Sequence, residues 1–198
     1  MTMTTYQAAA VIHALRGDAI TVATMSAMFA ISAVSPSPLN ISSVPLMGGA
    51  SGLGLGLAMT RPERAVMILD GDASLLMELG TMAQITDVAP PRLIHMVFNN
   101  ASQFSGIGNL QRPGVSLDFV SLAKAAGYAT AARIDSPAAL QAALTDALAK
   151  PGPHFLELAI ASPHRFTTEG PQPELPDLQF SRMGDEARAM MAELGTQR

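Results

Sequence analysis

The sequence lacks cysteine and tryptophan and is poor in charged residues. The absence of cysteine excludes disulfides, thiolate metal sites and cysteine nucleophiles, and it is typical of a reducing, cytoplasmic compartment. Charged residues make up 14% of the 198 residues, against roughly 25% in an average soluble protein. The net charge is −4 with no run of Lys or Arg, which argues against nucleic-acid binding and anionic membrane surfaces.

The longest apolar stretch, residues 19–34, is shorter than the ~20 residues of a membrane helix. Its flanks do not resemble those of a signal peptide, because it follows Arg16-Gly17-Asp18. We expect a buried strand followed by a turn here, and no membrane segment.

Strand and helix patterns alternate along most of the chain. Helical periodicity covers residues 6–16, 48–59, 74–85, 117–126 and 137–149, and apolar strand patterns cover 19–24, 64–69, 93–98, 128–134 and 155–160. This alternation predicts an α/β fold, a doubly wound and mainly parallel sheet with helices on both faces. One domain is expected over residues 1–161, and residues 162–198 are expected to form a proline-rich arm and a short helix at 185–194.

Two polar clusters follow predicted strands, at Asp70 to Ser74 and at Asn99 to Ser102. Ligands of open α/β sheets bind outside the carboxyl ends of the strands, which is where both clusters lie. Asp72, the Asn100 amide and a backbone carbonyl after it offer the oxygen ligands that Mg²⁺ or Ca²⁺ prefers.

An anion can bind beside these oxygen ligands, at the turn from strand into helix. Backbone N–H groups of Gly71, Ala73 and Ser74, with the Ser74 hydroxyl, can face it. The pattern therefore predicts a metal-bound diphosphate, with Asp70 left open as an alternative ligand.

The run Gly71-Asp72-Ala73-Ser74, a 24-residue spacer and the pair Asn99-Asn100 resemble the thiamine-diphosphate motif. Over residues 45–160 the chain is similar to the β subunits of sulfopyruvate and phosphonopyruvate decarboxylases. The resemblance implies the thiamine-diphosphate-binding fold, the cofactor thiamine diphosphate, and Mg²⁺ held by Asp72, Asn100 and the Ser102 carbonyl. It also implies decarboxylation of a small 2-oxo acid, in which the cofactor serves as an electron sink.

The resemblance extends to neighbouring segments. Met47-Gly48 is similar to the family's Gly-Ser-Met-Gly segment, which makes Met47 a candidate prop for the cofactor. The segment 100–111 resembles the loop that folds over cofactor and substrate. It adds Phe104 as a cofactor contact and Gln103, Ser105 and Gln111 as substrate contacts.

Other polar residues lie outside these motifs. Arg112 is the nearest cation for a substrate carboxylate. His95 is expected to be a core residue, whereas His154 and His164 are expected in loop or arm segments.

The sequence departs from the family pattern at two places. Ala73 stands where the motif has glycine, so a positive φ there would be strained. Pro45-Leu46 replaces the preceding Gly-Ser, which weakens the diphosphate contacts expected there.

The family's activating glutamate belongs to a separate pyrimidine-binding domain, and none of the glutamates, including Glu63, Glu78 and Glu157, matches its position. The resemblance therefore implies a partner α subunit that carries this domain, in an α₂β₂ or larger assembly. A charge-poor surface buried against that subunit agrees with the composition.

Three other interpretations are weighed against this one. The glycines from Gly48 to Gly54 fit the pattern of short-chain dehydrogenases, but Tyr6 and Tyr128 lack a lysine four residues later. A degenerate, non-catalytic subunit damaged at Ala73 is the second alternative. Carboligation or acyl transfer with the same cofactor is the third.

Overall fold

The structure is a computed structural model that describes residues 2–44, 47–103, 109–162 and 179–196. Its central sheet contains β1 (Ile20–Ala23), β2 (Asn40–Ser42), β3 (Val66–Gly71), β4 (Leu93–Asn99), β7 (Thr130–Ile134) and β8 (His154–Ala159), and β5 (Ser102–Gln103) pairs with β6 (Leu110–Gln111) in a separate antiparallel ribbon. The helices are α1 (Thr5–Leu15), α2 (Met25–Val34), α3 (Gly49–Thr60), α4 (Asp72–Met77), α5 (Thr81–Val88), α6 (Phe119–Ala126), α7 (Pro137–Ala149) and α8 (Gln179–Glu193).

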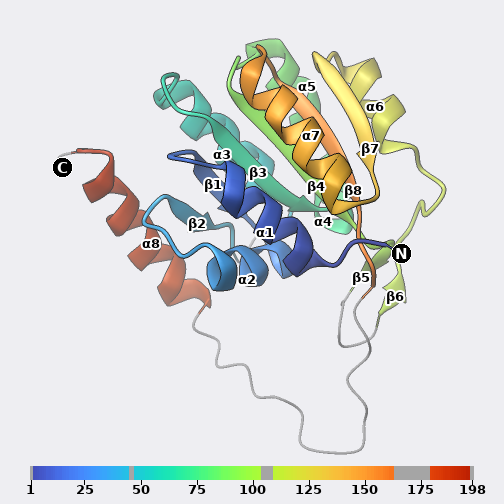
Figure 1. Cartoon of the computed structure of the whole chain (residues 1–198), viewed down its shortest axis with the longest axis horizontal. Coiled ribbons are helices and arrows are strands. Elements are labelled where there is room, and N and C mark those ends of the chain that lie inside the picture. The colour runs from blue at the N-terminus through green and yellow to red at the C-terminus, as the bar shows by residue number, and fades with distance from the viewer. Residues whose placement is uncertain (1, 45–46, 104–108, 163–178, 197–198) are drawn as a thin grey trace, which may run out of the picture.

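The six strands of the central sheet are all parallel, in the order β2-β1-β3-β4-β8-β7. Parallel neighbours require crossover connections, and helices supply them here. Figure 1 shows α1 and α7 on one face of the sheet and α3, α5 and α6 on the other. The prediction of a doubly wound α/β fold is confirmed.

Strand β3 shows how the two faces are built. Met67 and Leu69 point into the core that α1, α2 and α7 cover, whereas Val66 and Ile68 point into the core under α3, α5 and α6. This alternation follows from the two-residue period of a strand. A parallel strand that is buried on both faces therefore has a continuous apolar sequence, which is the pattern that predicted this strand.

Three secondary-structure predictions are wrong in detail. The second half of the 19–34 stretch is helix α2, not a turn, and the sequence patterns missed the edge strand β2. The single helix predicted over 74–85 is divided into α4 and α5, because Glu78 closes α4 by donating its N–H to the carbonyl of Leu75.

The C-terminal helix α8 begins earlier than predicted and covers the edge strand β2. The Glu186 carboxylate accepts hydrogen bonds from the N–H and the hydroxyl of Ser42, at 2.6 and 3.1 Å. Met190 packs into the core beneath α3. Covering β2 leaves fewer unpaired backbone groups at this edge of the sheet. The arm predicted for 162–177 falls almost entirely outside the described residues.

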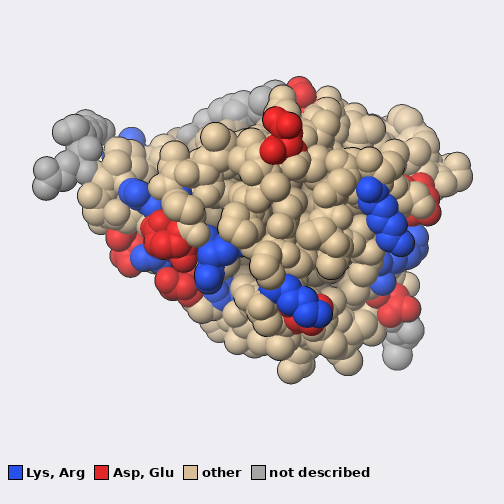
Figure 2. Space-filling view, turned by 90° about the horizontal axis from the view of Figure 1, so that it is seen from above, with Lys and Arg blue, Asp and Glu red and all other residues tan. Residues whose placement is uncertain are grey.

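Large parts of the surface carry no charge. In Figure 2 most of the visible face is free of Lys, Arg, Asp and Glu, and charges of both signs gather toward its left and right sides. No helix among the described residues is both long and apolar enough to span a membrane.

Candidate cofactor site at the carboxyl edge of the sheet

The two polar clusters predicted from the sequence meet at one edge of the sheet. Strands β3 and β4 are parallel neighbours, and Gly71 lies beside Phe98 in their register. The turns that follow the two strands are therefore adjacent. A cavity of about 370 Å³ opens at this edge, lined by Met25, Ser26, Phe29, Met47, Gly71, Asp72, Ala73, Ser74, Met77, Phe98, Asn100, Ser102 and Gln103.

Asp72 lies at the start of α4 and is 2% exposed. Its Oδ2 accepts hydrogen bonds from the Ala101 N–H at 3.0 Å and from Nε of Arg112 at 2.5 Å. Burial raises the pKa of this carboxyl, and the hydrogen bond and charge of Arg112 oppose the rise. The carboxylate that lines the cavity is thus held from two sides and paired with a cation.

The turn after β4 is fixed by its own asparagines. Asn99 Oδ1 accepts from the Ala101 N–H at 3.1 Å, and Asn100 Oδ1 accepts from the N–H and hydroxyl of Ser102, both at 3.0 Å. Ala101 has a φ of 57°, so the chain reverses sharply here. Asn99 is held in turn by the buried Glu157 of β8, which accepts from Nδ2 at 2.7 Å.

A hydrogen bond joins the turn before α3 to the start of α4. Gly48 donates its N–H to Oγ of Ser74 at 2.8 Å. Gly48 has a φ of 92°, and a Cβ there would lie 2.5 Å from Cγ of Glu78. The position therefore requires glycine on both counts. Farther along α3, a Cβ on Gly54 would overlap Ile68, so this glycine of the dehydrogenase-like pattern serves close helix–strand packing.

Ala73 does not carry the strain that its place in the motif suggested. It lies inside α4, and it is not among the residues with positive φ. Its side chain is buried and lines the cavity. The backbone argument for a degenerate site therefore has no support here.

Most of the site residues predicted from the sequence line this one cavity: Met47, Gly71, Asp72, Ala73, Ser74, Asn100, Ser102 and Gln103. Gly48 adjoins it through its bond to Ser74. Gln111 is exposed in β6 and does not line the cavity. Phe104 and Ser105 lie outside the described residues.

Arg112 differs from its predicted role. It was expected to be the nearest cation for a substrate, but its side chain is buried against Asp72. Asp70, the alternative metal ligand, does not line the cavity. It is fully buried and accepts hydrogen bonds from the Ser51 hydroxyl and from the Gly71 N–H.

Sequence reasoning missed the apolar walls of the cavity. Met25 and Phe29 come from α2, which was interpreted as a turn, and Met77 comes from the last residue of α4. The spacing of Met25 and Phe29 by four residues places both on one face of a helix. That spacing was the available signal.

The described histidines lie away from the cavity. His95 is buried in β4 with its Nδ1 2.9 Å from the hydroxyl of Tyr128, as a core residue should be. Burial and the nearby charge of Asp70 raise the pKa of Tyr128. His154 belongs to β8 and is buried, so its prediction as a loop residue is wrong. His164 lies outside the described residues.

The donor atoms at the cavity suit a hard cation. Among the described residues, no three His, Asp or Glu side chains gather around a point. Asp72 instead lies with an amide side chain, Asn100, and with Ser102. One carboxylate with neutral oxygens agrees with Mg²⁺, which keeps several water or phosphate ligands of its own.

Known proteins are similar to this chain over most of its length. The family model described as thiamine pyrophosphate enzyme, C-terminal TPP binding domain, matches residues 19–158. Phosphonopyruvate decarboxylase of Streptomyces viridochromogenes is 38% identical over 117 residues, 59% of this chain and 29% of that protein. Sulfopyruvate decarboxylase subunit beta of Methanothermobacter thermautotrophicus is 40% identical over 67 residues, 34% of this chain and 36% of that protein.

Solved structures share the fold. Benzoylformate decarboxylase from Polynucleobacter necessarius superposes with a TM-score of 0.64 at 21% identity, covering 81% of this chain and 34% of that chain. This chain spans about a third of the length of the curated relatives described above.

Proposed function

The chain belongs to the family of C-terminal TPP-binding domains of thiamine pyrophosphate enzymes, and from this premise we propose that its carboxyl-edge cavity binds thiamine diphosphate through a divalent cation. The observation that carries the proposal is that Asp72 and Asn100, which follow two different strands, line the same cavity. The 2-oxo acid decarboxylases among its relatives support decarboxylation of a small 2-oxo acid as the reaction.

The residues that line the cavity have separate roles in this proposal. Asp72, Asn100 and the backbone carbonyl of Ser102 hold Mg²⁺, or Ca²⁺, which prefers the same kind of donor. The backbone of Gly71, Ala73 and Ser74 faces the diphosphate. Met47 packs against the rest of the cofactor, and Gln103 meets the substrate.

Thiamine diphosphate, when bound, accepts the electron pair that carbon dioxide leaves behind. The chain contributes a water-poor wall, because Met25, Phe29, Met77 and Phe98 line the cavity with apolar atoms. Electrostatic interactions strengthen in such an environment. The fixed Asp72 carboxylate would therefore hold the cation firmly, and the cation would hold the anionic diphosphate.

The activating acid must come from elsewhere. Asp72 is the only described carboxylate that lines the cavity, and no described Arg or Lys lines it. A second domain, on a partner α subunit in an α₂β₂ or larger assembly, would supply the acid and the cations for an anionic substrate. Three relatives of this chain are named as beta subunits. Phe29 and Met77, 39% and 52% exposed at the cavity, would be buried by such a partner.

Calorimetric titration of thiamine diphosphate with Mg²⁺ tests the proposal. The full chain is titrated alone and after co-purification with its partner subunit, with Asp72→Ala as the control. Binding that needs the metal and is lost in the variant supports the proposal. Absence of binding in both preparations refutes it, and full decarboxylase activity of the chain alone would refute the need for a partner.

A further inference from the structure

Three segments meet in a closed ring of hydrogen bonds beside the cavity. Oδ2 of Asp72 accepts from the Ala101 N–H at 3.0 Å and from Arg112 Nε at 2.5 Å. Arg112 closes the ring by donating its own backbone N–H to the Ala101 carbonyl at 3.1 Å. The ring joins the start of α4, the turn after β4 and the residue that follows β6.

The Arg112 guanidinium is fixed on its other side as well. Nη1 donates to the carbonyls of Gly114 and Pro113, at 2.5 and 3.1 Å, and Cζ lies 4.9 Å from the centre of the Phe119 ring. The rigid fork of a guanidinium can serve several fixed acceptors at once, which the single ammonium of lysine cannot do equally well. The Arg112 side chain therefore has little freedom to move.

Stability alone does not account for this arrangement. Arg112 and Asp72 are each 2% exposed, and Nη2 of Arg112 has no hydrogen-bond partner among the described residues. Two buried charges are costly to desolvate, and apolar residues of similar size often stabilise a fold as well or better. A function is therefore the better explanation for a buried pair that leaves one donor unsatisfied.

The ring includes or adjoins each residue of the proposed cation site. Asp72 belongs to the ring, and Ala101, which also belongs to it, stands between Asn100 and Ser102 in the sequence. We infer that Arg112 is a positioning residue, which holds the Asp72 carboxylate and the Asn100–Ser102 turn in the arrangement that a divalent cation needs. This inference rests on the proposed function. It adds a residue that the motif does not contain and that acts through Asp72.

A competing effect has the opposite sign. The positive charge of Arg112 repels a cation, so its removal by itself would tighten metal binding. Residues that orient metal ligands typically contribute roughly 10–100-fold to metal affinity. With three segments tied by one side chain, we expect positioning to exceed repulsion, and removal of Arg112 to weaken the site.

Mn²⁺ is the probe, because its free form is counted directly by electron paramagnetic resonance. The full chain is titrated with Mn²⁺ and thiamine diphosphate, in whichever preparation, alone or with the partner subunit, the wild type binds. Arg112→Met should weaken Mn²⁺ affinity by roughly 10–100-fold. Arg112→Lys keeps the charge but not the forked guanidinium. Its Mn²⁺ affinity should lie between those of Arg112→Met and the wild type.

Arg64→Met is the matched control. It removes another arginine that pairs with a carboxylate, Asp18, but Asp18 is 79% exposed and neither residue lines the cavity. Its Mn²⁺ affinity should be unchanged. Unchanged or tighter binding in Arg112→Met overturns the inference, as does full recovery in Arg112→Lys, which would leave charge as the sole role.

The outcomes separate the two proposals. A wild-type protein that binds neither Mn²⁺ nor the cofactor refutes the proposed function, and the role of Arg112 with it. If the wild type binds Mn²⁺ and Arg112→Met binds it with equal affinity, only the role of Arg112 is refuted. If circular dichroism shows that Arg112→Met does not fold, Arg112→Lys decides, because affinity at least threefold weaker supports positioning and equal affinity overturns it.

Discussion

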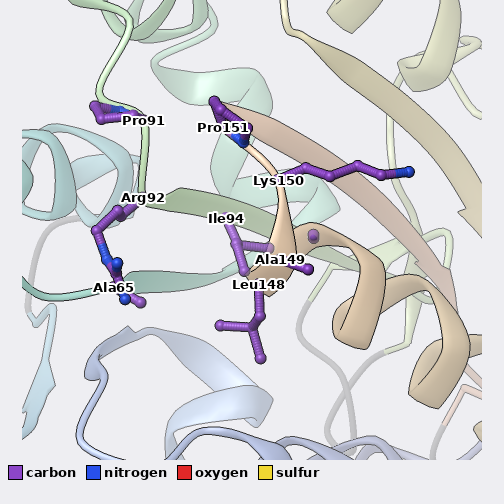
Figure 3. Close-up of a pocket in the computed structure, with 9 residues that line it drawn as sticks. Ala65, Pro91, Arg92, Ile94, Leu148, Ala149, Lys150 and Pro151 are labelled. Atoms are coloured by element: carbon purple, nitrogen blue, oxygen red, sulfur yellow. The ribbon is translucent and has the colours of Figure 1, made fainter.

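The two edges of the sheet carry cavities of nearly equal size but different chemistry. The cavity at the carboxyl edge measures about 370 Å³, and the one at the amino edge about 360 Å³. The second is lined by residues that precede β3, β4 and β8, among them Ala65, Arg92 and Lys150. In Figure 3 the side chains of Arg92 and Lys150 extend in different directions. Volume alone therefore does not identify a site.

The difference lies in how charges are held. At the carboxyl edge, Asp72 and Glu157 are buried and their oxygens are fixed by named donors. At the amino edge, the ion pair of Lys150 among the described residues is with Asp146, and both side chains are more than half exposed. A fixed, buried charge has a defined direction and a strong field, whereas an exposed pair is mobile and screened by salt. Function is expected where charges converge and are held.

The largest expected effect tests this contrast at Asp72. Asp72→Asn keeps the shape but removes the charge that a metal needs. Because groups that only orient metal ligands contribute roughly 10–100-fold, loss of the ligand charge should weaken metal-dependent cofactor binding by more than about 100-fold. Calorimetric titration measures it. Arg92→Ala, at the other edge, should bind normally, and a loss there would break the comparison.

Gly48 tests whether the backbone of the carboxyl edge is as constrained as its charges. Gly48→Ala forces a side chain into positive φ and against Glu78, which should lower the free energy of unfolding by about 1–3 kcal/mol. Gly52, exposed in α3 with open space around it, is the control. Gly52→Ala should raise stability by about 0.5–1 kcal/mol. Urea denaturation measures the stability of both variants. Equal changes in the two would contradict the claim that position 48 requires glycine.

Glu157 tests support from the neighbouring strand. Glu157→Ala leaves Nδ2 of Asn99 without its acceptor, which should lower the free energy of unfolding by about 1–3 kcal/mol. Cofactor binding should weaken as well, because Asn99 shapes the turn that presents Asn100. Glu157→Gln keeps a carbonyl oxygen and should recover most of the loss in urea denaturation. If the two variants are equally unstable, the charge and not the hydrogen bond matters.

The sequence specified the fold and the cluster at the strand ends because both depend on local patterns. Alternating apolar strands and helices determine the sheet, and parallel neighbours bring Asp72 and Asn100 to one edge. The partner of Asp72 could not be predicted in this way, because Arg112 lies 40 residues away in the sequence, after the β5–β6 ribbon. The apolar wall from α2 was missed because residues 19–34 form one apolar stretch rich in Thr, Ser and β-branched residues, which was interpreted as a strand followed by a turn.

The smallest expected effect is at the amino edge, on the exposed pair of Lys150 and Asp146. Lys150→Met removes an i,i+4 pair at the end of α7 whose side chains are 60% and 57% exposed. Such pairs contribute about 0.3–0.5 kcal/mol, because water screens them and ordering two long side chains costs entropy. Urea denaturation should therefore show a change below about 0.5 kcal/mol, with cofactor affinity unaltered. A loss as large as that of Glu157→Ala would mean that the charges at the amino edge are held as firmly as those at the carboxyl edge, and the contrast between the two edges would no longer explain where the site lies.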